Sequence, residues 1–513
     1  MTAVKSNLAT PIDIMRTLVL TLLAAAGSVT AAQNAPTELP DIGSPSDVVI
    51  TKGDEYSLGR MVVRGLRDQG QLLEDPEVAD YIQSLGQRIA VQATDGTQSF
   101  TFFVVRDPNI NAFALPGGFI GVNQGLILAT TNEAQLAGVL AHEIAHVTQR
   151  HLARSARSQS KQGLVTAAAL IAAILIGAAT GSADAVPAGI ALAQGSAAQA
   201  QLNYTRANEY EADRVGIAIL SASGFDPDSM ADFFETIGRR SGLSSGIIPE
   251  LLQSHPVSSN RIAEARERAR QLTTIVRPES ASYAFMRERV RVMASPTDSD
   301  LRPYYTDRAN RNPPTSGEQF GAALAQLQAG NAAAALPVLR EIGQDRLDLP
   351  FLQTALATAR ANAGDKNGAI DTLERALKIS PRNVPLTVRY AELLLAEGRA
   401  RLAHQVLLDV FNVVPPTQAQ IKLTAMAASS AGDTGDAYYY MSEYHIAGGD
   451  LPLACEQLEL ALAARDITPI QRQKYAARLK EIKDVVAESA GKRKRKRERE
   501  REQSGDGSAK ISG

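Results

Sequence analysis

Cysteine, tryptophan and the other aromatic residues are scarce in this 513-residue chain. It contains one cysteine, Cys455, so no disulfide bond can form within the chain in any redox compartment. Tryptophan is absent, and aromatic residues make up 5% of the sequence. The 53 basic and 55 acidic residues nearly balance, and this balance gives no argument for nucleic acid or for an acidic substrate as partner.

Long apolar runs are also missing, since none reaches the roughly 20 residues that cross a bilayer as a helix. Residues 164–179 and 185–198 are the two apolar, small-residue segments in the interior of the chain. We expect them to form a helical hairpin (164–198) over the functional site. Contact with a membrane surface and a membrane span remain as alternatives.

The N-terminal residues 1–32 combine basic residues, a short apolar segment and an end of small residues. This order is typical of a secretory signal peptide, with a membrane anchor as the alternative. The length of the chain predicts two or three domains, and its abundance of alanine indicates helix.

Helical spacing predicts helices at 54–69, 75–93, 132–154, 203–221 and 258–272. Aromatic and β-branched residues predict a strand at 100–106 and a second at 111–122, interrupted by Gly117-Gly118. A glycine pair in a strand lets another backbone approach closely.

The C-terminal half repeats with a period of 34 residues. Glycine recurs at 330, 364, 398 and 432, and two alanine series and a proline pair have the same spacing. Small residues where paired helices cross, with this period, are typical of tetratricopeptide repeats. No repeat has the usual tryptophan, and the phase slips after Gly432, so the pattern predicts three to five repeats.

The most specific motif is His142-Glu143-Ile-Ala-His146, which falls inside the predicted helix at 132–154. Residues i and i+4 lie on one face of a helix, so both imidazoles can reach one metal ion. Glu143, one residue further round, would face the position left for water. A pair of surface histidines is the alternative.

A catalytic zinc ion usually has three protein ligands and one position for water. The predicted helix that carries Glu209, Glu211 and Asp213 is the obvious source of the third ligand. Spacing alone does not separate Glu209 from Glu211. For Asp213, a surface salt bridge with a neighbouring arginine is the alternative.

Three segments together resemble a known family: residues 138–154 (GVLAHEIAHVTQRHLAR), the pattern E-x-x-x-D from Glu209 to Asp213, and Ser254-His255-Pro256. They are similar to the HEXXH zinc metallopeptidases of the HtpX and CAAX prenyl protease type. The similarity is greatest to their BepA-like periplasmic branch, and the C-terminal repeats agree with that branch.

The resemblance implies that Glu209 completes the ligand set of one Zn²⁺ ion per chain, and that Asp213 orients a ligand histidine. It also implies that His255 approaches the metal, either as a resting-state ligand or as a group that stabilises the oxyanion. An ordinary turn residue is the alternative for His255. We expect His151 to be structural.

Given this site, Glu143 would take a proton from the attacking water and pass it to the leaving amine. Substrate backbone often pairs with an edge strand beside such a site, and residues 111–122 are the candidate strand. An ordinary hairpin is the alternative.

We therefore predict a mainly α fold, with an α+β zincin-type metalloprotease domain that has a small sheet, followed by an α-solenoid. The expected divisions are a signal peptide (1–32), a linker (33–46), the protease domain (47–295), a linker (296–315), the repeat domain (316–487) and a charged disordered tail (488–513).

The predicted function is a zinc endopeptidase of the bacterial cell envelope, located in the periplasm, for quality control and assembly of outer-membrane proteins. The repeat domain would bind clients or the assembly machinery, and residues 164–198 could contact a membrane. The alternative is a chaperone or adaptor whose proteolysis is minor or held off by His255.

Overall fold

The computed structural model describes residues 51–93, 98–152, 154, 206–243, 251–252, 255–296, 299–343 and 346–506. The predicted signal peptide and the predicted hairpin at 164–198 lie outside these residues. Within them, no helix combines the length and the apolar character needed to cross a membrane.

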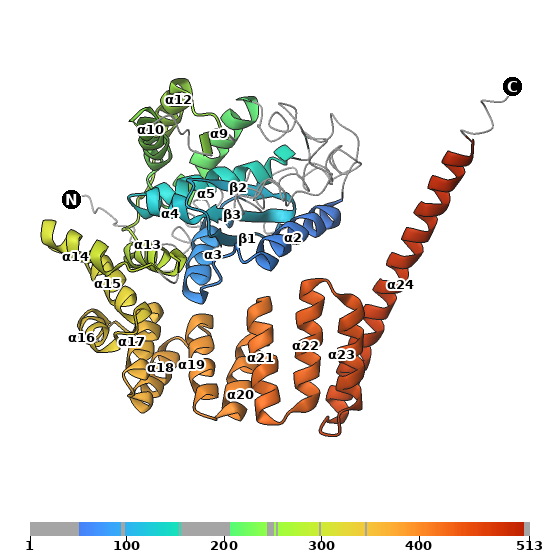
Figure 1. Ribbon diagram of the computed structural model, residues 1–513. Helices are drawn as coiled ribbons and strands as arrows, with labels where there is room; N and C mark the ends of the chain where they lie inside the picture. Colours follow the sequence, from blue (N-terminus) through green and yellow to red (C-terminus); the bar gives the residue numbers. More distant parts are fainter. Residues whose placement is uncertain are drawn as a thin grey trace, which may run out of the picture. The chain divides into compact units, whose positions relative to one another are not determined.

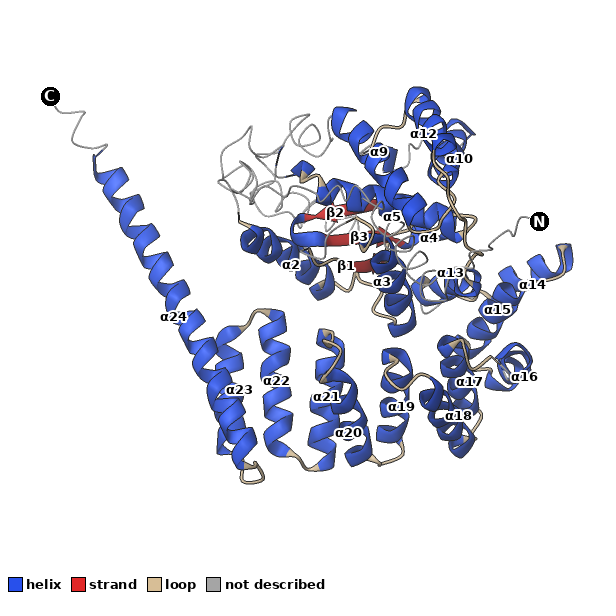
Figure 2. Ribbon diagram, turned by 180° about the vertical axis from the view of Figure 1, so that it is seen from behind, coloured by secondary structure: helices blue, strands red, loops and turns tan. Residues whose placement is uncertain are grey.

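A three-stranded sheet lies among the helices of the N-terminal part (Figures 1 and 2). Its strands are β1 (Thr101–Val105), β2 (Ala112–Leu115) and β3 (Phe119–Asn123), in the order β1-β3-β2. The central strand β3 runs parallel to β1 and antiparallel to β2. β2 is therefore an edge strand, and no other strand of the described residues pairs with its outer side.

The second predicted strand is in fact two strands, β2 and β3, joined by the short 3-10 turn η1 (Pro116–Gly118). Gly117 and Gly118 both have positive φ, at 79° and 84°, a conformation that side chains disfavour. A Cβ atom on Gly117 would lie 2.4 Å from Cα of Tyr56, and one on Gly118 would lie 2.2 Å from the carbonyl oxygen of Ser99. The predicted close approach of another backbone is confirmed at both positions.

Eight helices of the described N-terminal part surround this sheet. They are α2 (Lys52–Asp68), α3 (Pro76–Ala90), α4 (Gln124–Ala129), α5 (Glu133–Thr148), α9 (Arg206–Ala222), α10 (Asp228–Leu243), α12 (Ser259–Gln271) and α13 (Ala281–Ala294). Helix α3 packs on β1 and α5 packs on β2. One hydrophobic core joins the sheet to all of these helices except α2, which packs on η1.

The described residues 316–506 form five helix pairs, which follow one another from α15 at the left to α24 at the right of Figure 1. They are α15 (Ser316–Gln328) with α16 (Ala332–Gly343), α17 (Pro350–Asn362) with α18 (Lys366–Ile379), α19 (Val384–Ala396) with α20 (Ala400–Phe411), α21 (Gln418–Ala431) with α22 (Thr434–Gly448), and α23 (Leu451–Ala463) with α24 (Pro469–Asp506).

The glycine series of the 34-residue period lies in the turns inside the first four pairs, with φ between 71° and 89°. Gly449 takes the same conformation between α22 and α23, where the sequence shows the phase slip. The predicted fold class, a mainly helical chain with a small sheet followed by a helical repeat array, is confirmed.

Two predicted irregular segments are largely helical. The expected linker at 296–315 contains α14 (Arg302–Arg311), whose Tyr305 is buried and donates a hydrogen bond to Glu288 at 3.0 Å. The expected disordered tail belongs to α24 as far as Asp506.

A buried cluster of charges connects α3, α13 and α19. Arg289 donates to both carboxylate oxygens of Asp75, at 2.7 and 2.8 Å, and lies 2.8 Å from Glu77. Arg389, from the third helix pair, donates to both carboxylate oxygens of Glu77 at 3.2 Å. Burial works against the charged form of Asp75, yet Arg289 and Arg389 hold its pKa below the usual value. The repeat domain is thus joined to α3 by ion pairs.

Candidate metal centre

Helix α5 begins at a side-chain cap and is buried on all sides. Asn132 Oδ1 accepts a hydrogen bond from the backbone N–H of Gln135 at 2.9 Å. Gln135 Oε1 accepts from the backbone N–H of Thr131, one residue earlier than a capping box requires. Every residue from Gln135 to His146 is buried, as expected for a helix that is apolar all round. The helix is therefore a rigid support for His142, Glu143 and His146.

Four buried side chains converge at one point. His142 and His146 come from α5, Glu209 from α9, and His255 from the segment before α12. Their ligand atoms lie within 4.8 Å of one another. The structure therefore brings Glu209 and His255 to the predicted metal face of α5.

The spacing of these donor atoms fits a metal ion. Nε2 of His142 lies 3.0 Å from Nε2 of His146, 3.4 Å from Nδ1 of His255 and 3.5 Å from Oε2 of Glu209. Oε1 of Glu209 lies 3.4 Å from Nε2 of His146 and 3.0 Å from Nδ1 of His255. A tetrahedral zinc ion with bonds of about 2.0–2.1 Å holds its ligand atoms about 3.3 Å apart. Donor types and separations both suit zinc.

Glu143 lies beside this cluster with a fully buried carboxyl group. Its Oε1 atom is 3.6 Å from Nε2 of His255, and the backbone of Ala114 in β2 lies near enough to lower its pKa. Burial outweighs these effects and raises the pKa of Glu143 above its usual value. A raised pKa moves a carboxyl group towards the range in which it can both accept and return a proton.

The acidic residues of α9 take different positions. Glu209 lies in the donor cluster, whereas Glu211, the alternative ligand, does not and contacts His151 and Arg154 instead. Asp213 Oδ1 is 3.0 Å from Nδ1 of His142, the ring nitrogen that faces away from the cluster. Asp213 is buried, so the surface salt bridge weighed from sequence is wrong.

Arg261, in the first turn of α12, is a residue of this site that the sequence patterns do not reveal. Its side chain is buried, and it donates to both oxygens of Asp213 at 2.7 and 2.8 Å. A third nitrogen lies 2.9 Å from Oε2 of Glu209. The only sequence signal is an arginine six residues after His255.

Charges within the cluster shift one another's pKa. Burial would raise the pKa of Glu209, but His255, His142 and His146 hold it well below the usual range. Burial lowers the pKa of His146 well below its usual value. Burial also opposes the charged form of His142, yet hydrogen bonds with Asp213 and Glu209 raise its pKa to about 10. An ionised Glu209 and a neutral His146 are the forms that bind a metal, whereas His142 would have to release a proton to bind one.

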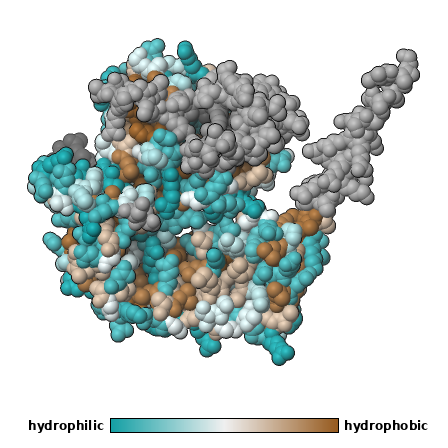
Figure 3. Space-filling view, viewed as in Figure 1, coloured by the Kyte–Doolittle hydropathy of each residue, from teal (hydrophilic) through white to brown (hydrophobic). Residues whose placement is uncertain are grey.

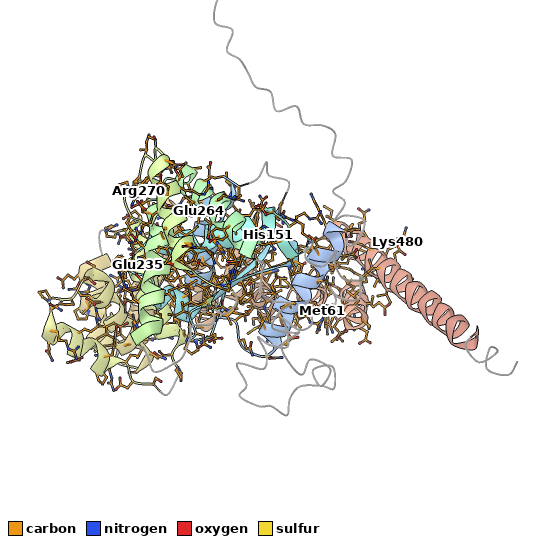
Figure 4. All side chains as sticks on the ribbon, turned by 90° about the horizontal axis from the view of Figure 1, so that it is seen from above. Met61, His151, Glu235, Glu264, Arg270 and Lys480 are labelled. Carbon is orange, nitrogen blue, oxygen red and sulfur yellow. The ribbon has the colours of Figure 1, made fainter. Side chains whose placement is uncertain are left out.

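His151, expected to be structural, lies next to a cluster residue. Helix α5 ends at Thr148, before the predicted Arg154, and the chain turns at Arg150. The turn brings Nδ1 of His151 to 2.8 Å from Nδ1 of His146. In Figure 4, His151 is labelled among the side chains between the cyan and green elements.

Comparison with known proteins agrees with this site and this architecture. Residues 76–269 match the model of Peptidase family M48, and residues 361–428 match a tetratricopeptide repeat model. The chain is 35% identical over 395 residues to the putative beta-barrel assembly-enhancing protease of Vibrio cholerae, a match that covers 76% of this chain and 81% of that protein.

Two further relatives match over different lengths of the chain. The beta-barrel assembly-enhancing protease of Escherichia coli is 30% identical over 485 residues, which are 92% of this chain and 97% of that protein. A mitochondrial metalloendopeptidase of Schizosaccharomyces pombe is 30% identical over 187 residues, 36% of this chain and 52% of that protein. The chain therefore belongs to Peptidase family M48, as a metalloprotease with C-terminal tetratricopeptide repeats.

Proposed function

We propose that this protein is a zinc-dependent endopeptidase of the bacterial cell envelope that acts on proteins destined for the outer membrane. The observation that carries this proposal is the buried cluster of His142, His146 and Glu209 with Glu143 beside it. In this proposal the first three residues hold one zinc ion. Zinc bound there would lower the pKa of water towards neutrality and polarise the scissile carbonyl group.

The other residues of the site position atoms and move protons. Glu143 accepts the proton of the attacking water and returns it to the leaving amine. Asp213, whose Oδ1 lies 3.0 Å from Nδ1 of His142, fixes the orientation of that ring. His255 lies between Glu209 and Glu143, at 3.0 and 3.6 Å, where it can donate a hydrogen bond to a developing oxyanion.

The edge strand β2 is the proposed docking strand for substrate. It packs against α5, and its Ala114 lies beside Glu143. An extended peptide added to its outer side would form backbone hydrogen bonds and pass the proposed catalytic base.

Clients and location are inferred from relatives and from the repeat domain. The Escherichia coli relative is named beta-barrel assembly-enhancing protease, and the Vibrio cholerae relative is a putative protease of that name. The repeat domain exposes Met426 and Leu460 on its helices and Val413 in the turn after α20. Figure 3 shows brown, hydrophobic surface among teal over this domain. We assign this surface to the binding of clients or of the assembly machinery. Residues 1–32 would direct export into the periplasm. The protease domain would span residues 47–295, and the repeat domain residues 316–487.

Glu143→Gln tests the proposal. The amide should leave zinc binding unchanged because Glu143 is not a ligand, and it should abolish cleavage of an unfolded outer-membrane protein because an amide cannot accept the proton. Zinc content and cleavage are measured for each variant, with and without a chelator. Glu267→Gln, on the exposed face of α12, is the matched control. Cleavage by Glu143→Gln at the rate of the control would refute the role of Glu143.

The second candidate function is a chaperone or adaptor in which proteolysis is held off. The observation that favours it is the position of His255, whose Nδ1 lies 3.0 Å from Glu209 and 3.4 Å from His142. A histidine there fills the place that water needs. In cells that lack the protein, full rescue of outer-membrane protein assembly by Glu143→Gln would favour the adaptor, and failure to rescue would favour the protease.

A further inference from the structure

The chain makes a turn directly after α5. Arg150 has a φ of 52°, in the left-handed region that residues with a side chain seldom adopt. Its guanidinium pairs with Glu55 of α2 at 2.8 Å, which ties the turn to another helix. On a continued helix, His151 would be rotated about 140° from His146 and would face away from the cluster. The turn instead brings the two rings together.

The contact between these rings fixes which nitrogen carries which proton. Nε2 of His146 belongs to the donor cluster, 3.0 Å from Nε2 of His142. When Nε2 of a neutral imidazole binds a metal, the proton is on Nδ1. Nδ1 of His146 is 2.8 Å from Nδ1 of His151, so His146 donates and His151 accepts.

A proton on the other nitrogen of His151 then has an acceptor. Nε2 of His151 lies 3.1 Å from Oε2 of Glu211, which can accept its N–H. The same oxygen of Glu211 lies 3.0 Å from Nη1 of Arg154. A directed chain of hydrogen bonds runs from His146 through His151 to Glu211, and the cationic Arg154 favours the ionised carboxylate at its end.

The other histidine of α5 has a matching support. Asp213 lies 3.0 Å from Nδ1 of His142 and is held in turn by Arg261. Glu211 and Asp213 are both on α9, the helix that also supplies Glu209. Each proposed ligand histidine is thus backed by a carboxylate of α9 whose charge is balanced by an arginine.

We propose that His151 and Glu211 are positioning residues that hold the ring of His146 and its Nδ1 proton in the orientation needed to bind zinc. This inference rests on the proposed function, because it takes His146 as a zinc ligand. Carboxylate partners of ligand histidines fix the ring and raise its basicity, and their loss typically weakens metal binding about 10–100-fold. Here the carboxylate acts through an intervening imidazole.

The test uses the full-length protein, with the dissociation constant of Zn²⁺ measured by competition with a chromophoric chelator. His151→Phe keeps a ring of similar shape without the hydrogen bonds and should weaken zinc binding about 10–100-fold. His151→Gln can accept from His146 through its carbonyl oxygen and donate to Glu211 through its amide, and should restore most of the affinity. The visible absorption of the Co²⁺-substituted protein should change for His151→Phe and return towards the parent for His151→Gln.

Glu211→Ala provides a second variant at a partly exposed position, in case His151→Phe does not fold. It should weaken zinc binding about tenfold, whereas Arg214→Ala, at an exposed position of α9, should bind as the parent does. Parent-like affinity and Co²⁺ spectrum in both His151→Phe and Glu211→Ala would overturn the inference. A parent protein that binds no zinc would refute the proposed function instead, so the two failures can be told apart.

Discussion

At the scale of single residues, Arg261 contacts both carboxylates, Asp213 and Glu209, that face the histidines of the site. It is buried and donates to Asp213 while lying 2.9 Å from Glu209. Two carboxylates brought close together in a buried site repel each other unless a cation balances them. Arg261 supplies that charge, and it holds both carboxylates in the positions that face the histidines.

We predict that Arg261→Met destabilises the protein by about 3–5 kcal/mol, because it leaves buried carboxylates without their cation. The free energy of unfolding, from urea denaturation of the metal-free protein, measures this effect. Zinc affinity should also fall, since Asp213 and Glu209 are no longer held in place. Arg268→Met, at a partly exposed position of the same helix paired with Glu264, should unfold like the parent. Equal stability of both variants would contradict the role given to Arg261.

Site residues that are related by helix spacing can be predicted from the sequence, whereas residues brought together by tertiary packing cannot. His142, Glu143 and His146 follow from one helix. The choice of Glu209 over Glu211 needs the family pattern, because both fit the spacing. His255 lies 113 residues from His142 along the chain and meets it only through tertiary packing.

His151 and Arg261 are the residues that the sequence does not reveal. The prediction from helical spacing continues α5 to Arg154. The chain turns at Arg150 instead, and no glycine or proline at this position marks the turn in the sequence. A buried arginine is also indistinguishable from a surface arginine in sequence, because its burial depends on partners elsewhere in the chain.

At the scale of elements, the site depends on how closely α9 approaches α5. A Cβ atom added to Gly216 of α9 would lie 3.2 Å from the backbone of Ala141, the residue directly before His142. Glu209, Asp213 and Gly216 are spaced i, i+4 and i+7, so they share one face of α9. The glycine therefore sets the distance at which the two carboxylates meet the histidines of α5.

We predict that Gly216→Leu separates the two helices and weakens zinc binding at least tenfold, with a loss of about 1–3 kcal/mol of stability from overpacking. Chelator competition and urea denaturation measure the two effects. Gly238→Leu is the matched control, because a Cβ at Gly238 of α10 meets no atom within 4 Å. If Gly216→Leu bound zinc as tightly as Gly238→Leu, the helix spacing would not control the site.

Helices and strands were predicted well where the sequence periodicity is strong. They were predicted less well where the conformation of a turn determines where an element ends. The 34-residue repeat is confirmed because its glycines and alanines recur at positions fixed by the turns and by the crossings of paired helices. The hairpin of β2 and β3 was predicted as one interrupted strand, since the sequence does not show that the chain reverses at Gly117 and Gly118.

At the scale of the whole molecule, the linker expected from sequence does not separate the two domains. A hydrophobic cluster includes Phe285 and Met286 of α13 together with Phe320 of α15 and Phe351 of α17. The expected linker at 296–315 contains α14, which packs on α15. The charge cluster at Arg389 adds a second connection between the domains.

We predict that Arg389→Met loosens this connection, since Glu77 and Asp75 then share only Arg289. The loss should be about 1–2 kcal/mol, less than for a fully buried pair, because 27% of the Arg389 side chain is exposed. Amide hydrogen exchange in α3 and α19 should become faster. Arg375→Met removes an exposed ion pair from the same repeat domain and should leave exchange there unchanged. Unchanged exchange in Arg389→Met as well would show that the ion pairs do not couple the domains.

The outer side of β2 has a consequence for which proteins can be cut. A peptide paired along the four residues of this strand must be extended over about 13 Å. A native client presents such a stretch only when it opens locally. The free energy of this opening is close to zero at frayed ends and reaches the full free energy of unfolding in the core. When opening is fast, cleavage follows the opened population, and each increase of about 1.4 kcal/mol in the opening free energy lowers it tenfold. With β2 as docking strand, the enzyme would select clients by their local stability more than by the residues around the cleaved bond.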